Sequence, residues 1–310
     1  MLFALRGAMV GLAFFGVVYC LLSVLVVIVW QGARLLRRNT GYSSARSLFA
    51  LRVFPLVGAA FVTIVFALPA FFLLEGGMDE DLGTVIFSAG TLLLFAAGLV
   101  RVVTAQAGAL RVREQWLRRS KALDNWIEAP TLRVPASAPP LLLCGISTPK
   151  ILVSEAAIAL LSPEELRVAI GHEVGHLGSR DNLKKLIQHG IPFPGMASLE
   201  HSWQAMAELE ADASAVSSCS DALNLASALI KLCDIAPMNE PPAFTTGFAG
   251  LTSLVKVRVQ RLLAWNEGIG HSRTTSWQWS LPGLFLLAYG AANYSHALLL
   301  THRLTEWFIH

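Results

Sequence analysis

The residues best suited to chemistry form the short sequence His172-Glu173-Val174-Gly175-His176, which reads H-E-x-x-H. On a helix the two histidines, four residues apart, project from one face and can bind one metal ion. Glu173 lies one step around the helix, where its carboxylate can reach a water on that ion without being a ligand. Two histidines, a carboxylate base and an open coordination position predict one zinc ion per chain and metal-assisted hydrolysis. The alternative is a chance spacing of ordinary side chains on a solvated helix.

Helix signals surround this motif. Ser162 offers an N-cap, Pro163 suits the first helical position, and Glu165 is placed to complete a capping box. We therefore expect a helix from about Pro163 to Leu177, with Gly178 ending it.

The acidic stretch from Ala207 to Asp212 offers candidates for a third zinc ligand. Glu208 and Asp212 lie four residues apart on one helix face, whereas Glu210 points nearly opposite and is expected to be solvated. If Glu208 binds the metal, Asp212 can accept a hydrogen bond from a ligand histidine and fix its tautomer. The alternatives are that all three carboxylates are surface charges, or that the ligand is one of three rivals: His189, Glu200 or His201.

The composition predicts a membrane protein. Of the 310 residues, 54% are hydrophobic and only 15% are charged, and the mean hydropathy is +0.56, so much apolar surface must meet lipid. The four cysteines show no C-x-x-C pattern, which argues against a disulfide framework. The net charge of +3 is modest.

Apolar runs long enough to cross a bilayer divide the chain. We expect spans at about 7–30, 53–74, 82–100 and, most weakly, 279–300. Residues 1–121 would then hold three spans and a basic extension, residues 122–275 a soluble domain, and residues 276–310 the fourth span with a short external tail.

Basic residues indicate the orientation of these spans. Arginines follow the first span and the third, whereas the loop after the second span carries Glu75, Asp79, Glu80 and Asp81 and no basic residue. The positive-inside rule places the N-terminus outside and the soluble domain in the cytoplasm, in a multi-pass protein of the inner membrane. Topology explains the arginines with fewer assumptions than nucleic-acid binding, so no nucleic-acid partner is expected.

Two short strands are expected just before the motif helix. Residues 141–145 and 150–154 are apolar and are separated by Ile146-Ser147-Thr148-Pro149, which predicts a hairpin. A free edge of this hairpin would bind an extended peptide by strand addition beside the metal. A purely structural hairpin is an equal alternative. The expected fold class is a mainly α membrane protein with a cytoplasmic α+β domain between the third and fourth spans.

Several motifs together carry a resemblance to a known family. In chain order they are Cys144-Gly145 with Pro149-Lys150-Ile151-Leu152, Leu161-Ser162-Pro163-Glu164-Glu165-Leu166, His172-Glu173-x-x-His176, Arg180-Asp181-Asn182-Leu183 and Glu208-x-x-Ala211-Asp212. The chain resembles the membrane zinc metallopeptidases of the beta-lactam sensor-transducers, and more distantly the heat-shock and prenyl-processing membrane metallopeptidases. The resemblance implies a zincin-like (gluzincin) domain with zinc ligands His172, His176 and Glu208 and with Glu173 as the catalytic residue. It departs from that family at Gly178-Ser179, and we expect no penicillin-binding sensor domain after the last span.

The function expected is that of an integral-membrane zinc endopeptidase. Its substrate would be a cytoplasmic or membrane-adjacent protein or peptide, cut in regulatory signalling, and its other partner is the lipid bilayer. One alternative is a membrane protein quality-control protease, and another is a non-catalytic signalling or scaffold protein that zinc stabilises. The sequence leaves a homo-oligomer or a separate sensor partner open.

Overall fold

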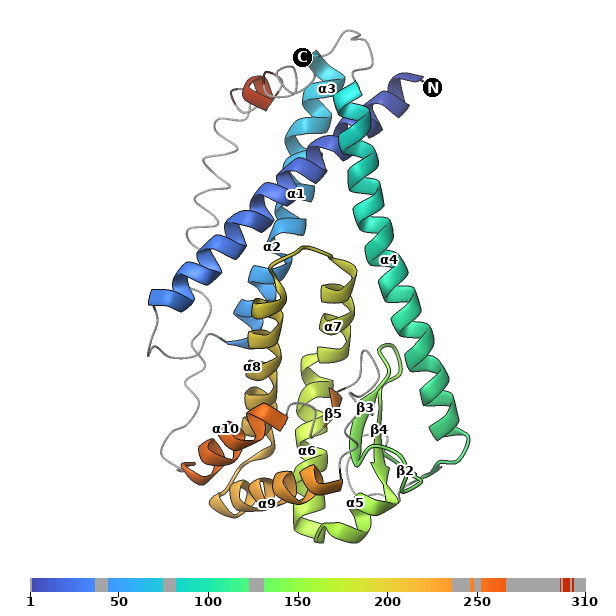
Figure 1. Ribbon diagram of the computed structural model, residues 1–310, viewed down its shortest axis with the longest axis vertical. Helices are drawn as coiled ribbons and strands as arrows, with labels where there is room; N and C mark the ends of the chain where they lie inside the picture. The colour runs from blue at the N-terminus through green and yellow to red at the C-terminus, as the bar shows by residue number, and fades with distance from the viewer. Residues whose placement is uncertain are drawn as a thin grey trace.

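The computed structural model describes residues 2–36, 44–74, 82–122, 131–235, 246–247, 252–265, 296, 298–301 and 303. Three long apolar helical segments come first (Figure 1). They are α1 (Leu2–Leu36), α2 (Ala45–Val62) with its continuation through the π-helical turn η1 (Thr63–Ala67) into α3 (Leu68–Leu74), and α4 (Leu82–Leu117). All three are long and apolar enough to cross a membrane. The expected fourth span at 279–300 falls almost entirely outside the described residues.

These helices extend beyond the spans predicted from hydropathy. Helix α2 begins at Ala45, eight residues before the expected start at 53, and α4 continues from the expected end at 100 to Leu117. Hydropathy marks only the apolar part of a helix, whereas the segment after Arg101 contains good helix formers that continue the same hydrogen-bond ladder. The extra length carries Trp116 and Leu117 to the sheet, where they pack against its buried residues.

The second apolar helical segment contains a local irregularity. Pro69 lacks an N–H and cannot donate to a carbonyl one turn earlier. The π-helical turn Thr63–Ala67 stands directly before it and continues the helix from Val62 to Leu68. Local adjustments of this kind are how membrane helices accommodate proline.

A small mixed sheet follows α4. It contains β1 (Lys121–Ala122), β2 (Thr131–Val134), β3 (Leu141–Cys144), β4 (Lys150–Ser154) and β5 (Thr246–Gly247), in the order β1-β2-β4-β3-β5. Strands β2 and β4 are parallel, and the other neighbours are antiparallel. The predicted hairpin is formed by β3 and β4, with Leu142 opposite Leu152.

The outer edge of β3 is not free. Leu142 and Leu143 pair with Gly247 and Thr246 of β5, about a hundred residues further along the chain. The free edge expected from the sequence is therefore wrong at these two positions, because pairing between distant segments leaves no local signal.

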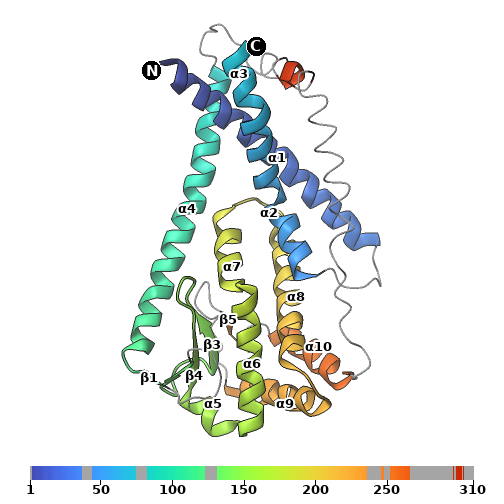
Figure 2. The same ribbon diagram turned by 180° about the vertical axis from the view of Figure 1, so that it is seen from behind.

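Six helices complete the described fold. They are α5 (Glu155–Leu160), α6 (Pro163–Ser179), α7 (Asp181–Gly190), α8 (Ala197–Ala215), α9 (Cys219–Ile235) and α10 (Thr252–Leu263). In both views α7 and α8 rise from the sheet end of the molecule toward α1, α2 and α4 (Figures 1 and 2). The apolar face of α6 packs with β3, β4 and α9 in one buried cluster that includes Ile170, Leu143 and Leu229. Burial of each such side chain stabilises the fold by about 1.5–3 kcal/mol and fixes which face of α6 remains for the histidines.

Helix α6 begins as the sequence predicts and ends two residues later than expected. The Ser162 side chain accepts from the N–H of Glu165, and the Glu165 carboxylate accepts from the N–H of Ser162, which completes the capping box. Gly178 remains helical. The left-handed residue that ends α6 is Arg180, with φ of 55°, and α7 starts at the next residue. The chain therefore leaves the right-handed helical conformation at Arg180, directly before α7, and not at Gly178.

Candidate metal centre

Two helices bring together the three residues that the sequence proposes as ligands. His172 and His176 come from α6 and Glu208 from α8, and all three are buried. The two Nε2 atoms are 3.1 Å apart, and each lies 3.4 Å from an oxygen of the Glu208 carboxylate. Ligands about 2.0–2.1 Å from a tetrahedral zinc ion would be separated by about 3.3 Å. The three groups therefore fit one such ion with little rearrangement.

A glycine allows the two ligand helices to approach. A Cβ atom on Gly175 would lie 3.2 Å from the Cα of Ala211, which is tighter than nine in ten real Cβ contacts. The side-chain oxygen of Ser214 would lie closer still, and because both atoms belong to α8, a larger residue at this position would push α8 away from α6. The glycine inside the H-E-x-x-H sequence thus belongs to the geometry that brings Glu208 to the histidines.

Each histidine is held through its other ring nitrogen. Nδ1 of His172 lies 2.9 Å from Oδ1 of Asp212, and Nδ1 of His176 lies 2.8 Å from Oδ2 of Asp181. Such contacts fix the tautomer and leave both Nε2 atoms to face the ion site. Asp212 thus stands where the sequence argument puts it. Sequence reasoning gave Asp181 no role, although it directly follows the turn that ends α6.

Glu173 is fully buried at the same place, and neither oxygen of its carboxylate has a hydrogen-bond partner among the described residues. Burial raises the pKa of this carboxyl group, although the nearby His176 and His172 act against that rise. Buried polar atoms are almost always paired with protein, water or an ion. A carboxylate that lacks a partner beside a ligand set is therefore suited to hold a water molecule next to a metal ion.

The surrounding charges also favour a cation at this point. Burial alone would lower the pKa of His176, but the Glu208 and Asp181 carboxylates raise it. For Glu208, burial alone would raise the pKa, whereas His176 and Arg258 hold it well below its usual value. At His176 the carboxylates thus outweigh the effect of burial, so this point favours a positive charge, which a divalent ion could supply.

Residues 143–206 match the model of peptidase family M48. The match includes the complete H-E-x-x-H motif and ends just before Glu208, and it supports the M48 metallopeptidase family for this region. No curated protein matches the chain. The finer resemblance to the beta-lactam sensor-transducers is not decided by this match and stays a prediction.

One buried arginine outside the M48 match completes the cluster. Arg258 of α10 donates from Nε to Oδ2 of Asp212 at 2.8 Å and from Nη2 to Oδ1 at 2.6 Å, and its Nη1 lies 2.9 Å from Oε2 of Glu208. Its guanidinium thus joins a proposed ligand to the carboxylate that holds His172. Sequence reasoning gave Arg258 no role, because α10 gives no local sign that it returns to α6 and α8.

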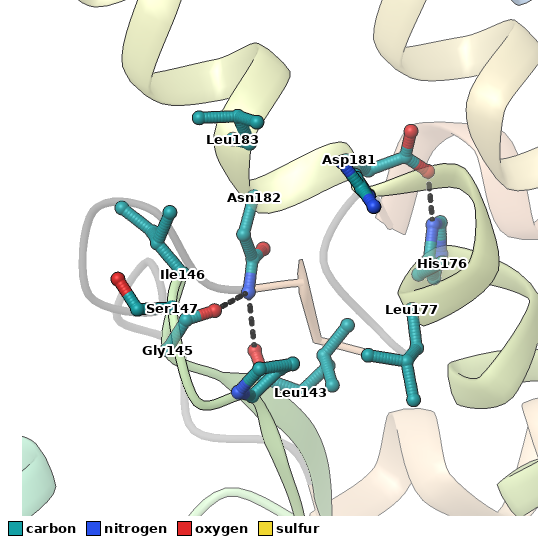
Figure 3. A pocket seen from close by; sticks show the side chains of 11 residues that line it. Leu143, Gly145, Ile146, Ser147, His176, Leu177, Asp181, Asn182 and Leu183 are labelled. Carbon is teal, nitrogen blue, oxygen red and sulfur yellow. Dashed lines mark hydrogen bonds and ion pairs between the residues drawn. The ribbon is translucent and has the colours of Figure 1, made fainter.

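A cavity of about 320 Å³ opens beside His176, inside the M48-matched region (Figure 3). It lies between the end of β3 and the junction of α6 and α7. The Asn182 amide donates to the carbonyls of Leu143 at 3.2 Å and Gly145 at 3.1 Å, which ties β3 to α7. The side chains of Leu143, Ile146, Leu177 and Leu183 make much of its wall apolar. The cavity can receive an apolar side chain of a peptide next to the metal centre.

The other residues considered near the third ligand lie outside the cluster of His172, His176 and Glu208. Glu210, expected to be solvated, is half-buried and accepts from the backbone N–H of Ala45 at 2.7 Å. Glu200, a rival ligand, pairs with Arg52 at 2.8 Å. The rival His201 is exposed, and the ligand cluster found among the described residues includes neither it nor His189.

Proposed function

We propose that this chain is an integral-membrane, zinc-dependent endopeptidase. Its substrate would be a cytoplasmic or membrane-adjacent protein, cut in regulatory signalling. The observation that carries the proposal is the convergence of His172, His176 and Glu208 beside the carboxylate of Glu173, which has no hydrogen-bond partner in the described part of the chain. The M48 match supports the same reaction class.

Each residue then has a distinct task. His172, His176 and Glu208 would hold the ion, and Asp212 and Asp181 orient the two imidazoles. A bound zinc ion supplies Lewis acidity, which polarises the peptide carbonyl and makes a water easier to deprotonate. Glu173 takes a proton from that water as the water oxygen bonds to the carbonyl carbon. It then passes the proton to the amine nitrogen as the peptide C–N bond breaks. The raised pKa of the buried Glu173 carboxyl suits a group that must both accept and release a proton.

The membrane placement rests on separate observations. Three apolar helices are long enough to cross a bilayer. The arginines after the first and third of these favour a cytoplasmic location for the peptidase domain, with the domain lying between the third span and a fourth near 279–300.

The test compares Glu173→Gln with Glu164→Gln, a matched change at an exposed position on the same helix. Both variants should retain one zinc ion per chain by metal analysis. Glu173→Gln should lose cleavage of a co-expressed substrate by at least about 100-fold, the scale of general acid–base catalysis, and Glu164→Gln should keep it. Equal cleavage by both variants would defeat the assignment of the base, and a protein that binds no zinc would defeat the proposal.

Proteomics of a knock-out separates a regulatory enzyme, with one stabilised regulator, from a quality-control protease with many stabilised proteins.

A further inference from the structure

The turn between α7 and α8 is held by all three membrane-spanning segments. The Tyr19 hydroxyl of α1 donates to the carbonyl of Pro192 at 3.0 Å. On α4, a Cβ atom at Gly98 would lie 2.6 Å from the carbonyl oxygen of Gly190, so only glycine allows this approach. Arg52 of α2 contributes the third contact. In both views this turn lies alongside α2, above the sheet and α6 (Figures 1 and 2).

Arg52 joins the two sides of the turn with one side chain. It is 2% exposed although it lies in an apolar span. Its Nε donates to Oε1 of Glu200 in the first turn of α8 at 2.8 Å. Its Nη2 donates to the carbonyl of Ile191 and, at 3.4 Å, to that of Gln188 at the end of α7. A charged residue at such a position is costly unless it is paired, and it usually marks a functional element.

A second contact joins α2 to α8 near the proposed ligand. The backbone N–H of Ala45, in the first turn of α2, donates to Oε1 of Glu210, two residues beyond Glu208. Between this contact and the Arg52–Glu200 pair, Leu48 of α2 packs with Trp203 and Met206 of α8 in one buried cluster. Helix α8 is therefore fixed to the start of α2 on both sides of its apolar contact.

We infer that the second span positions Glu208 against the two histidines, and that Arg52 is the positioning residue that couples the span to the metal centre. The histidines are on α6, which continues through α7 to the turn, and Glu208 is on α8, which leaves the same turn. Arg52 bonds to both arms of this hairpin, so its loss lets α8 shift relative to α6. A displacement of α2 within the membrane would therefore change the two 3.4 Å distances between the Glu208 carboxylate and the histidine rings. This inference rests on the proposed zinc site.

The experiment measures zinc binding by full-length protein in lipid nanodiscs, by competition with a chromophoric chelator. We compare wild type, Arg52→Met and Arg52→Lys with Arg133→Met, which breaks the exposed Arg133–Glu155 pair at the sheet. Arg52→Met should weaken zinc affinity about 10-fold, the lower end of what residues hydrogen-bonded directly to metal ligands contribute, because Arg52 acts on Glu208 only through α8. Arg52→Lys should recover part of the loss. Lysine keeps the positive charge but lacks the planar guanidinium that bonds to α8 and to the end of α7 at the same time. Arg133→Met should bind zinc as wild type does.

A second readout reports geometry rather than stability. The visible absorption of the cobalt-substituted protein should change in Arg52→Met and remain unchanged in Arg133→Met. For a cleaved peptide, kcat should fall while KM stays within about two-fold, because Arg52 does not line the cavity beside His176.

The outcomes separate the two proposals. If wild type binds no zinc, the proposed function fails. If wild type binds zinc and folded Arg52→Met shows the same affinity and cobalt spectrum, the inference is overturned and the function stands. If Arg52→Met does not fold, Glu200→Gln takes its place, because it removes the ion pair and keeps the side-chain volume. Glu200→Gln should weaken zinc affinity in the same direction, and an unchanged affinity would overturn the inference as well.

Discussion

His176 and Asp181 face each other across 2.8 Å from the two sides of the junction between α6 and α7. The junction is a single residue, Arg180, in the left-handed conformation, which costs about 1 kcal/mol or more for a residue other than glycine. The same turn that ends the motif helix therefore places the first residue of α7 against a proposed ligand. The strained backbone of Arg180 therefore helps to orient the imidazole of His176.

Asp181→Asn should leave the fold intact and weaken the metal centre. The neutral amide accepts a weaker hydrogen bond from Nδ1–H of His176 than the carboxylate does, so it orients the imidazole less firmly and raises its basicity less. Zinc affinity and kcat/KM should therefore each fall by about 10–100-fold. Asp181 also pairs with Lys184 at 3.0 Å, so Lys184→Met is the control and should change neither quantity by more than about two-fold. Similar losses in both variants would show that Asp181 acts through the ion pair instead.

Arg258→Met should destabilise the protein by about 3–5 kcal/mol. It removes the cation that pairs with the Asp212 and Glu208 carboxylates and leaves both buried. The free energy of unfolding in detergent, measured with urea, checks this value. Arg258→Lys should recover only part of the stability, because lysine cannot bond to both carboxylates through a planar fork. An Arg258→Met protein with the same urea midpoint of unfolding as wild type would contradict this interpretation.

Low pH should weaken the contact between α6 and α9. Burial alone would raise the pKa of Asp221, but hydrogen bonds from Ser217 and Arg167 lower it from 3.8 to about 2. Because the folded pKa lies below the unfolded one, the stability from this group is complete above pH 3.8 and is lost as pH falls toward 2.

Asp221→Asn tests this pH dependence. The variant should be less stable at pH 7 by about 1 kcal/mol, a value reduced for solvent screening around the exposed Arg167, and the difference should vanish near pH 2. Thermal unfolding of both proteins across that range measures it. A constant difference at every pH would contradict the assignment.

Releasing β5 should make the edge of β3 available to peptides. In Thr246→Pro/Gly247→Pro both residues lose their N–H, so the pairs with Leu143 and Leu142 cannot form. If an extended substrate competes for this edge, the double variant should bind and cleave a model peptide with a KM lower by about 3–10-fold, the gain of one or two hydrogen bonds. A higher KM would instead show that β5 forms part of the binding surface.

Much of the motif helix and its neighbours could be predicted from nearby residues. Ser162, Pro163 and Glu165 specify where α6 begins, and the four-residue spacing of His172 and His176 places both rings on one face of it. The β3–β4 hairpin and the three apolar helices follow from equally local patterns of apolar and turn residues. Local structure of this kind depends on periodicity and capping, which a short stretch of sequence contains completely.

The tertiary structure alone decided how distant segments meet. Arg258 reaches His172 and Asp212 from another helix, β5 covers the edge of β3, and Glu210 accepts from the first turn of α2 instead of facing water. Each of these contacts joins segments far apart in the chain, and each depends on how the helices pack. The residue types that make them are ordinary arginine, glutamate and threonine, so their roles follow from the packing of the folded chain.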